Sequence, residues 1–590
     1  MARFTERRIR RRTPAVPPET LPGSLHPLLR RVYAQRGIAD AAELNLALGG
    51  LAAPDGMVDL ERAAEVVADA TLAEAPTVVV GDYDADGATG TALLVRGLDA
   101  CARAAGKRAN VGYLIPDRFA EGYGLSPAVV RRLAPQRPAL LVTVDNGVSS
   151  VEGVAAAHAA GMRVVVTDHH LPGPRLPAAE AVVDPNRADD GFPSKHLSGV
   201  GVAFYLLLAV RARLAAAGAF TGERPNPAAW LDLVALGTVA DLVPLDYNNR
   251  ILVEQGLRRI RAGAATPGIA ALLELAGRDP RNVTAGDLSF AVAPRLNAAG
   301  RLDNMAVGVQ CLLADDPAEA AARARELDDL NRRRREVEAQ MTEEALAAVE
   351  DGSEEAGLGL CVAASGWHEG VAGILASRLK ERYQRPVVAF APAEGGGWKG
   401  SARSVPGLHI RDLLARMETL RPGLMRRFGG HAMAAGLTLD EARLPEFRAL
   451  FAETLDEALG GRSPQTELVS DGPLAVAERT LDAASALRDG GPWGTGFPEP
   501  LFDGVFHVAG ATALRGGHLR LKLHGGEGDP AATHRAIAFG AAARGWDLLE
   551  GAVHVAYRME INRYAGRTEL QLRVEHMERA GAATLKTASS

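Results

Sequence analysis

The segment TVVVGDYDADGATGTALL (77–94) joins a short apolar run to a helix-forming stretch through a loop that carries three carboxylates. Asp82, Asp84 and Asp86 occupy alternate positions in this loop, and carboxylates this close together repel each other unless a cation neutralises them. A calcium loop is excluded, because its twelfth position requires a Glu and holds Leu93 here. A solvated turn is the alternative, since Asp and Gly are common turn residues. Taken alone, the loop indicates either a cation site or an ordinary turn.

Length and composition limit the class of protein. The chain has 590 residues, 47% of them apolar, which is enough for roughly three or four domains. We find no apolar run near the length of a membrane span and no signal-peptide pattern, so we expect a cytoplasmic protein without membrane contact. The three cysteines lie far apart and form neither a metal nor a disulfide pattern, which fits a reducing compartment.

The charge distribution bears on nucleic-acid binding. The net charge is −6, so a nucleic acid would have to bind through a local basic surface. The segment RFTERRIRRRTP (3–14) is one basic cluster. We favour a flexible charged tail for this cluster over a dedicated DNA contact.

A strand–helix alternation begins near residue 60. Short apolar runs predict strands at 77–80, 111–115, 139–144 and 162–167. The residues between and after them predict helices, among them 126–133, 198–218 and 226–245. This βαβ pattern is typical of a parallel sheet with right-handed crossovers.

The second half of the chain has a different organisation. Residues 315–350 lack Gly, contain a single Pro and predict one long polar helix that connects two domains. A second α/β region follows from 357 to about 460. After it, alternating strands without long intervening helices predict a small all-β barrel or sandwich; they lie at 518–525, 534–540, 553–561 and 568–577.

Three of the predicted parallel strands end in carboxylates or histidines. Asp82 and Asp84 follow the first of them, Asp145 follows the strand at 139–144, and the strand at 162–167 is followed by Asp168, His169 and His170. All these ends lie at the carboxyl edge of a parallel sheet, where ligands bind. A further acid, Asp241, interrupts the apolar segment LGTVADLVPL. We therefore expect a metal site at this edge.

The residue types narrow the choice of metal. Oxygen and imidazole ligands suit Mn²⁺, Mg²⁺ or Zn²⁺, and the absence of Cys ligands argues against a structural zinc. Five or more ligands exceed the needs of one ion, so we infer two ions roughly 3.5–4 Å apart, as in two-metal phosphoester hydrolysis. Asp145 is the most plausible bridge between them.

The motifs GDYDADG, VDNG, TDHH and GTVAD, in this order, resemble the four motifs of the DHH phosphoesterase superfamily. The second α/β region resembles the associated DHHA1 domain through GSARS (400–404) and FGGHAMAAG (428–436). The segments IPDRFAEGYGL (115–125) and APRLNAAGRLDN (293–304) resemble motifs of the RecJ branch, and NRYAGRTELQLRVEH (562–576) resembles the end of its oligonucleotide-binding (OB) domain. The resemblance covers nearly the whole chain.

The resemblance implies a fold and a domain order. It implies two α/β domains, DHH with a parallel sheet and DHHA1, joined by a long helix and followed by an all-β OB-like domain. The expected boundaries are a helical lead-in (1–48), the DHH catalytic domain (49–312), the connecting helix (313–352), the DHHA1 substrate-binding domain (353–460), the OB-like nucleic-acid-binding domain (466–580) and a tail (581–590).

The resemblance also implies roles for the residues at the sheet edge. It implies two Mn²⁺ or Mg²⁺ ions per active site, one held by Asp84, Asp145, His169 and Asp241. Asp82 and the bridging Asp145 would hold the other, and His170 would lie beside the scissile phosphate. Asp86 and Asp168 would orient the loop and the imidazole. Some relatives carry a metal-binding His just before the first motif; residues 78–81 offer no ligand here, so the first ion would bind more weakly.

Further residues are expected to hold the substrate. Ser401 and Arg403 can donate hydrogen bonds to phosphate, Gly430 permits a close backbone approach, and His431 can donate to an oxyanion. Arg295, Asn297 and Arg301 form a similar polar set, and Arg118 and Tyr123 could steer the end of a strand. For Arg295, Arg301 and Arg403, the alternative is a salt bridge at a domain interface. For Arg118 and Tyr123, the alternative is a packed loop turn.

Together these features predict a monomeric, metal-dependent exonuclease that degrades single-stranded DNA from its 5′ end to mononucleotides in DNA repair and recombination. Polarity and product follow from the resemblance, as do the expected partners, a single-strand-binding protein and a RecQ-type helicase. The alternative is a DHH phosphodiesterase for short oligonucleotides or cyclic dinucleotides. A catalytically dead scaffold is disfavoured, because every metal-binding motif is intact.

Overall fold

The computed structural model describes residues 8–350, 357–393, 395–462, 467–525, 531–564 and 566–581. They fall into two compact units. The catalytic unit, defined here as residues 42–334 and 491–499, contains the predicted parallel sheet, and the second unit contains residues up to 41, 335–490 and 500 onward. Residues 3–7 of the basic cluster, and residues 582–590 of the predicted tail, lie outside the described residues.

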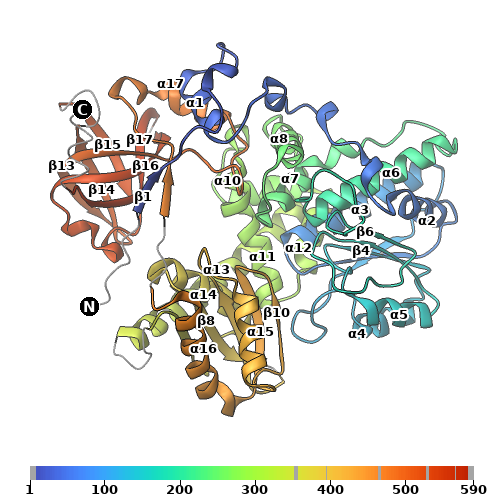
Figure 1. The fold of residues 1–590 in the computed structure, drawn as a ribbon. Coiled ribbons are helices and arrows are strands. Elements are labelled where there is room, and N and C mark those ends of the chain that lie inside the picture. The colour runs from blue at the N-terminus through green and yellow to red at the C-terminus, as the bar shows by residue number, and fades with distance from the viewer. Residues whose placement is uncertain are drawn as a thin grey trace. The chain divides into compact units, whose positions relative to one another are not determined.

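A five-stranded parallel sheet forms the centre of the catalytic unit (Figure 1). Its strand order is β3-β2-β4-β5-β6, and the strands are β2 (Thr77–Gly81), β3 (Val111–Leu114), β4 (Leu140–Val144), β5 (Arg163–Thr167) and β6 (Ala181–Val183). The first four were predicted. The sequence analysis missed β6, because a strand of three residues is too short to stand out as an apolar run.

Helices cover both faces of this sheet (Figure 1). Apolar side chains of α4 (Pro127–Leu133) and α5 (Val151–Ala159) form a core cluster with β2, β4 and β5 on one face. The other face carries α2 (Leu60–Leu72), α3 (Ala85–Ala104) and α6 (Gly199–Ala216). By length and composition α6 could cross a membrane, contrary to the expectation from the sequence, but most of it is buried among its neighbours.

The remaining helices of the catalytic unit follow in sequence. They are α7 (Leu231–Ala240), α8 (Tyr247–Arg261), α9 (Pro267–Leu275), α10 (Ala285–Asp287), α11 (Ala293–Leu302) and α12 (Ala306–Leu313). The predicted helix at 226–245 is wrong at both ends, because a 3₁₀ turn (Pro227–Trp230) precedes α7 and a loop begins at Asp241. The predicted long helix is confirmed as α13 (Pro317–Glu350).

A mixed α/β layer follows α13 in the second unit. Its sheet has the order β10-β11-β9-β8-β7, in which only β7 and β8 are parallel. The strands are β7 (Leu360–Ala363), β8 (Val387–Pro392), β9 (Trp398–Arg403), β10 (Arg427–Gly430) and β11 (Ala434–Leu439), and the helices are α14 (Glu369–Tyr383), α15 (Ile410–Leu420) and α16 (Leu444–Leu459).

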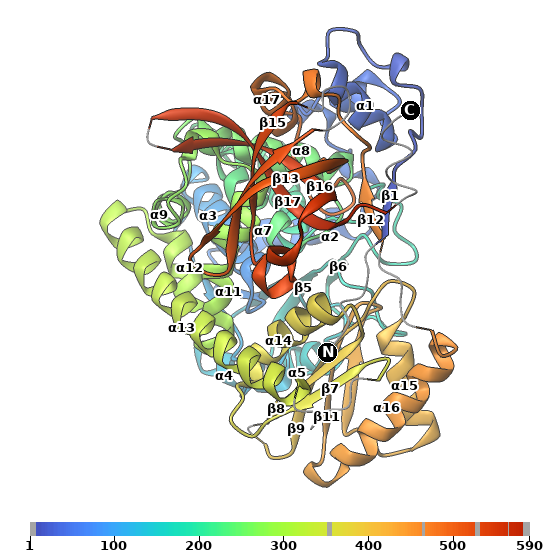
Figure 2. The same ribbon diagram turned by 90° about the vertical axis from the view of Figure 1, so that its left-hand side faces the viewer.

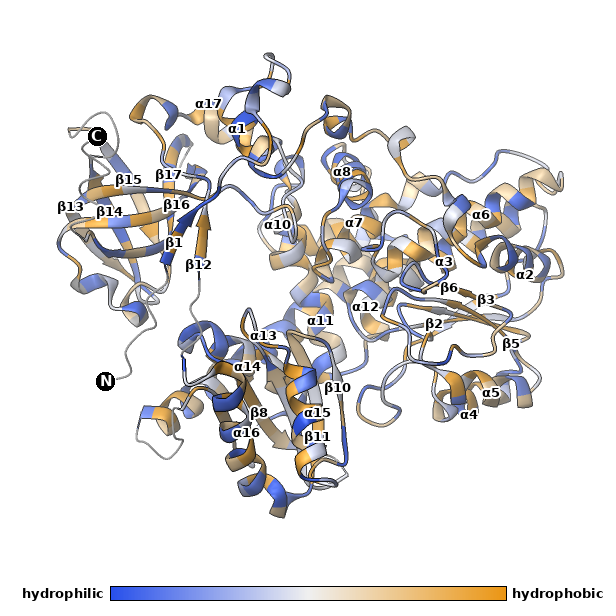
Figure 3. Ribbon diagram, in the orientation of Figure 1, coloured by the Kyte–Doolittle hydropathy of each residue, from blue (hydrophilic) through white to orange (hydrophobic). Residues whose placement is uncertain are grey.

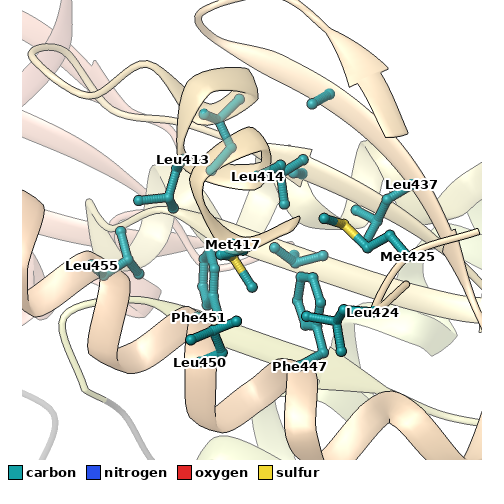
Figure 4. Packing of buried hydrophobic residues seen from close by; sticks show 14 of the residues in the cluster. Leu413, Leu414, Met417, Leu424, Met425, Leu437, Phe447, Leu450, Phe451 and Leu455 are labelled. Atoms are coloured by element: carbon teal, nitrogen blue, oxygen red, sulfur yellow. The ribbon is translucent and has the colours of Figure 1, made fainter. Parts of the chain in front are cut away.

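The core of this layer explains its helix pattern. Leu413, Leu414 and Met417 of α15 point toward Phe447 and Phe451 of α16, and the leucines and methionines around them close the cluster (Figure 4). Both helices carry apolar and polar stretches, whereas β8 is buried and apolar up to its last residue, Pro392 (Figure 3). The 3.6-residue periodicity of α15 and α16 therefore follows from burial on one side.

The all-β domain is a closed barrel, which decides between the predicted barrel and sandwich. Its strand order is β13-β14-β15-β17-β16, with β15 and β17 parallel. Figure 2 shows β13, β16 and β17 among the strands of this domain. The strands are β13 (Phe502–Leu514), β14 (His518–His524), β15 (Thr533–Ala538), β16 (Gly551–Tyr564) and β17 (Arg567–Arg579). The sequence analysis missed β13, and α1 (Pro27–Gln35) and α17 (Leu481–Asp489) complete the unit.

The basic N-terminal segment is not a tail over its described part. Arg8–Arg11 form β1, which pairs in parallel with β12 (Glu467–Ser470). The guanidinium of Arg11 donates to Asp503 at 2.9 Å. The expectation of a flexible tail is therefore wrong from residue 8 onward, because arginines of this segment pair with carboxylates on neighbouring strands.

Asp503 joins this segment to the barrel through a buried charge network. It also accepts hydrogen bonds from Ser470 Oγ (2.5 Å) and His554 Nε2 (2.9 Å). Although burial opposes it, donation from His554 and Arg11 lowers the pKa of Asp503 to about 2. Burial likewise opposes the charge of His554, but Asp503 and Glu578 raise its pKa to about 9.

This network predicts a pH window of stability for the second unit. The His554 contribution is complete below its ordinary pKa of about 6.5 and is lost as pH rises through about 9. The Asp503 contribution is present above about 3.8 and is lost as pH falls through about 2. We expect the free energy of unfolding, measured by denaturant titration, to fall by about 3 kcal/mol between pH 6.5 and 9.5. His554→Gln should flatten this alkaline fall, whereas His507→Gln, at an exposed position, should leave it unchanged; equal falls in both variants would contradict the assignment.

Candidate metal centre

The three-carboxylate loop begins where β2 ends and becomes the first turn of α3. Asp84 is the N-cap of α3, and its Oδ1 accepts the N–H groups of Asp86 (2.9 Å) and Gly87 (3.0 Å). Asp82 is buried just before it, and its Oδ1 has no hydrogen-bond partner among the described residues. A Cβ on Gly87 would lie 2.5 Å from the Asp82 backbone nitrogen, so only glycine allows the loop to fold this tightly.

Asp145 follows β4 in a left-handed backbone conformation, with φ 62°. Its Oδ1 lies 2.9 Å from His169 Nε2. The next residue, Asn146, donates to the carbonyl oxygens of Val80 (3.0 Å) and Val144 (2.9 Å). Asn146 thereby ties the end of β4 to the end of β2, which fixes Asp145 beside the Asp82 loop.

Asp168 is an orienting residue, as the sequence analysis expected. It accepts the backbone N–H groups of Val148, His169 and His170, at 2.9, 2.8 and 3.2 Å. It also lies 2.8 Å from His170 Nδ1. Together these bonds fix the backbone of the two histidines and the direction of the His170 imidazole.

Asp86 has a similar framework role, because it accepts the N–H groups of Gly199 (2.6 Å) and Val200 (2.9 Å) at the start of α6. It nevertheless lies 3.9 Å from His169 Nε2, and Asp241 lies 3.6 Å from the same nitrogen. The cluster therefore contains three sets of potential ligands among the described residues. They are Asp82, Asp84 and Asp145; Asp86, His169 and Asp241; and Asp145, His169 and His170.

The electrostatics of this cluster favour a cation. Burial, followed by the charges of neighbouring aspartates, raises the pKa of Asp82, Asp145 and Asp241 well above the usual range. Burial and the neighbouring His170 lower the pKa of His169 to about 4, which leaves a neutral imidazole able to bind a metal. The partnerless Asp82 Oδ1 and these oxygen and nitrogen donors fit Mn²⁺ or Mg²⁺.

His170 differs from its neighbour. Burial lowers the pKa of its ring, but the hydrogen bond and charge of Asp168 outweigh burial and raise it to about 9. Tyr123 lies against this ring, with its hydroxyl donating to the Asp145 carbonyl at 2.8 Å and 3.2 Å from His170 Nδ1. Arg118 lies 4.3 Å above the ring of Tyr83, so the loop at 117–124 borders the cluster.

The polar set of α11 lies in the framework of the site. Asn297 Oδ1 accepts the N–H of Ala85 at 2.7 Å, at the start of α3. Arg295 is buried, pairs with Asp328 at 2.8 Å and donates to the Ala291 carbonyl at 2.5 Å. The Arg295 pair favours the salt-bridge alternative for that residue, Asn297 supports the start of α3, and substrate contact by Arg301 stays a prediction.

Residues expected to hold phosphate gather on β9 and β10 of the second unit. Ser401 is paired with Gly436 of β11, and Arg403 with Ala434, while Gly430 ends β10 with φ 139°. The N–H of His431 donates to the Ala434 carbonyl at 2.8 Å. The structure therefore brings Ser401, Arg403, Gly430 and His431 to one end of the sheet.

Arg403 lies among polar partners without a carboxylate in the described structure. It donates to Ser377 Oγ (3.1 Å) and to the carbonyl of Ala402 (2.8 Å). Burial lowers its pKa, and within the described part of the chain no carboxylate pairs with it. A half-buried guanidinium without an acidic partner is suited to an anionic ligand.

Sequence reasoning missed two residues at the sheet edge. Asp184 follows β6 as the other acids follow their strands, and burial raises its pKa to about 7. Asn186 donates to the His169 carbonyl at 2.6 Å. Recognising β6 would have identified Asp184, since the signal is again a carboxylate directly after an apolar strand, whereas Asn186 carries no such signal.

Comparison with known proteins identifies the family. Three family models match the chain: the DHH family N-terminal domain at residues 76–238, the DHHA1 domain at 357–457 and the RecJ OB domain at 470–576. The single-stranded-DNA-specific exonuclease RecJ of Dickeya dadantii is 51% identical over 574 residues, covering 96% of this chain and 98% of the relative. The enzyme of the same name from Escherichia coli is 50% identical, with 94% and 96% covered.

The chain belongs to the RecJ family. A crystal structure of RecJ from Thermus thermophilus in complex with Mn²⁺ matches 99% of this chain and 81% of its own, at 31% identity and a TM-score of 0.79. A second, in complex with Mg²⁺, matches with a TM-score of 0.75. The predicted RecJ resemblance and the predicted fold class are thereby confirmed.

The raised carboxylate pKa values predict that the metal-free centre destabilises the fold. Above pH 3.8 an acid with a raised folded-state pKa costs stability, so Asp145→Asn should increase the free energy of unfolding in EDTA, by about 1–3 kcal/mol. Asn keeps an oxygen that can face His169. Added Mn²⁺ should stabilise the wild type more than the variant. Thermal melts with and without Mn²⁺ test this, with exposed Asp55→Asn as control; a variant less stable in EDTA would contradict it.

Proposed function

We propose that this protein is a metal-dependent exonuclease that degrades single-stranded DNA from the 5′ end to mononucleotides. The observation that carries the proposal is the convergence of Asp82, Asp84, Asp145, His169 and Asp241 at one sheet edge, with Asp82 Oδ1 left without a hydrogen-bond partner in the described structure. Relatives that match over nearly their whole length are named single-stranded-DNA-specific exonucleases, which supports the exonuclease activity and the single-stranded substrate. The barrel favours a polymeric substrate over a dinucleotide, because barrels of this topology bind single strands.

We assign two divalent ions, Mn²⁺ or Mg²⁺, to the cluster. Asp84, Asp145, His169 and Asp241 would hold one, and Asp82 and Asp145 the other; Asp86 and Asp168 keep the framework in place. Bound ions supply Lewis acidity and activate water for phosphodiester hydrolysis. Despite burial, Asp168 stabilises the protonated form of His170 and raises its pKa to about 9, so His170 would offer a positive N–H to the negative charge that develops on phosphate.

The remaining assignments concern the substrate and its setting. We propose that Ser401, Arg403, Gly430 and His431 bind a phosphate of the strand, and that Arg118 and Tyr123 contact its end. The enzyme would act as a monomer in the cytoplasm, in DNA repair and recombination. A single-strand-binding protein and a RecQ-type helicase are its proposed partners, because an exonuclease for single strands needs a strand made available to it.

The primary test is Asp84→Asn on matched 5′- and 3′-labelled oligonucleotides. Asn keeps an oxygen that can cap α3 but removes the charge that a cation needs, so folding should survive. We expect metal-dependent release of labelled mononucleotide from the 5′ end and a loss of about 100-fold or more in kcat. Exposed Asp55→Asn is the control. An intact long strand with a cleaved dinucleotide would replace the proposal with the short-oligonucleotide phosphodiesterase.

The phosphate site is tested by Arg403→Lys, which keeps the charge but loses the planar pair of donors. We expect kcat/KM on a 5′-phosphorylated strand to fall by about 10-fold or more, equivalent to roughly 1.4 kcal/mol. Arg411→Lys, at an exposed position of α15, is the matched control. Equal kcat/KM for the Arg403 variant and the wild type would show that Arg403 is structural.

A further inference from the structure

The segment GPWGTGFPE (491–499) belongs to the catalytic unit, although the chain on either side of it belongs to the second unit. It folds into a tight turn in which the N–H of Gly494 donates to the Phe497 carbonyl at 2.9 Å and the N–H of Phe497 returns to the Gly494 carbonyl at 3.2 Å. The rings of Trp493 and Phe497 stack at 5.0 Å with an interplanar angle of 11°. The segment is therefore a compact, internally bonded element.

This turn packs on the loop that follows Asp241. The N–H of Leu245 donates to the Thr495 carbonyl at 2.7 Å. A Cβ on Gly494 would lie 2.7 Å from Leu245 Cδ1, and one on Gly496, where φ is 73°, would lie 3.1 Å from Pro244 Cβ. Gly496 needs glycine because its backbone is left-handed and faces Pro244, and Gly494 lies directly against the Leu245 side chain.

The turn also holds the helix that the loop enters. Phe497 is buried, and the guanidinium of Arg250, in the first turn of α8, lies 4.4 Å from the centre of its ring. The N–H of Arg250 donates to the Asp246 carbonyl at 2.9 Å, at the end of the same loop. Thus the turn contacts both the loop and its exit.

The loop needs such support more than the other ligand segments do. Asp82, Asp145 and His169 follow strands in the interior of the sheet, whereas Asp241 is the C-cap of α7, with a side chain 27% exposed. The next residue, Leu242, has φ 61° and is 54% exposed. On the other side of the loop, Asn249 Nδ2 donates to the Pro244 carbonyl at 3.0 Å.

We propose that residues 491–499 are a positioning element of the metal centre, which fixes Asp241 by clamping the loop 242–246 against α8. This inference rests on the proposed function, since it assumes that Asp241 binds a divalent ion. The element contributes no ligand itself. It acts by limiting where the Asp241 carboxylate can lie relative to His169.

The test is the affinity of the full-length protein for Mn²⁺, measured by electron paramagnetic resonance titration of free ion. Phe497→Leu removes the ring beneath Arg250 and keeps most of the volume, and Gly496→Ala introduces a side chain at a left-handed position. Both variants should lower the affinity for one of the two Mn²⁺ ions by about 10-fold or more. Exonuclease kcat should recover at high Mn²⁺ with the KM for single-stranded DNA unchanged.

The control is Phe290→Ala, because Phe290 is 75% exposed and lies outside the element. Wild-type Mn²⁺ affinity in both Phe497→Leu and Gly496→Ala would overturn the inference while leaving the proposed function intact. No Mn²⁺ binding by the wild type would instead overturn the proposed function. Thermal melts in EDTA check that each variant folds. If one variant does not fold, the other decides the test. Activity that a folded variant loses and that high Mn²⁺ does not restore would also count against the inference.

Discussion

Mutual repulsion among buried carboxylates is the constraint on which the catalytic unit depends. A parallel sheet brings the ends of β2, β4 and β5 to one edge, and each end carries an acid. Without a cation, burial and then the charges of the neighbouring aspartates raise the pKa of Asp82, Asp145 and Asp241. The surrounding structure must hold them together against this repulsion, and bound cations are what make the arrangement favourable.

The hydrogen bonds divide the acids into two groups. Asp86 and Asp168 accept two or more backbone N–H groups, which fixes α6 and the two histidines. Asp168, which also faces His170, keeps a lowered pKa despite burial. Asp82 has an oxygen with no such donor in the described structure, and that oxygen is left for a cation. Asp84 belongs to both groups. It accepts two backbone N–H groups, but both bond to Oδ1, so its other carboxylate oxygen is left for a cation.

The sequence was sufficient for the parts of the site that follow strands. An apolar run followed by an acid is a local pattern, so Asp82, Asp145 and His169 could be placed at one edge before the structure was known. The sequence was insufficient where contacts between distant parts of the chain determine the role of a residue or the formation of a strand. Nothing local distinguishes Arg295, whose partner Asp328 is 33 residues away, from an arginine free to bind phosphate. Similarly, β1 forms because it pairs with β12, which lies far downstream in the sequence.

The position of residues 491–499 also shows that the catalytic unit is not a continuous stretch of chain. A family model for its N-terminal domain ends at residue 238, just before Asp241, and the loop beyond it is held by a turn from far downstream. The turn lies between α17 and β13, so the chain leaves the second unit and returns to it within a few residues. A fragment that ends with α13 would keep every proposed metal ligand but lose the contacts of Thr495 and Phe497. The full set of ligands and the full framework that positions them therefore exist together only in a chain that extends past residue 499.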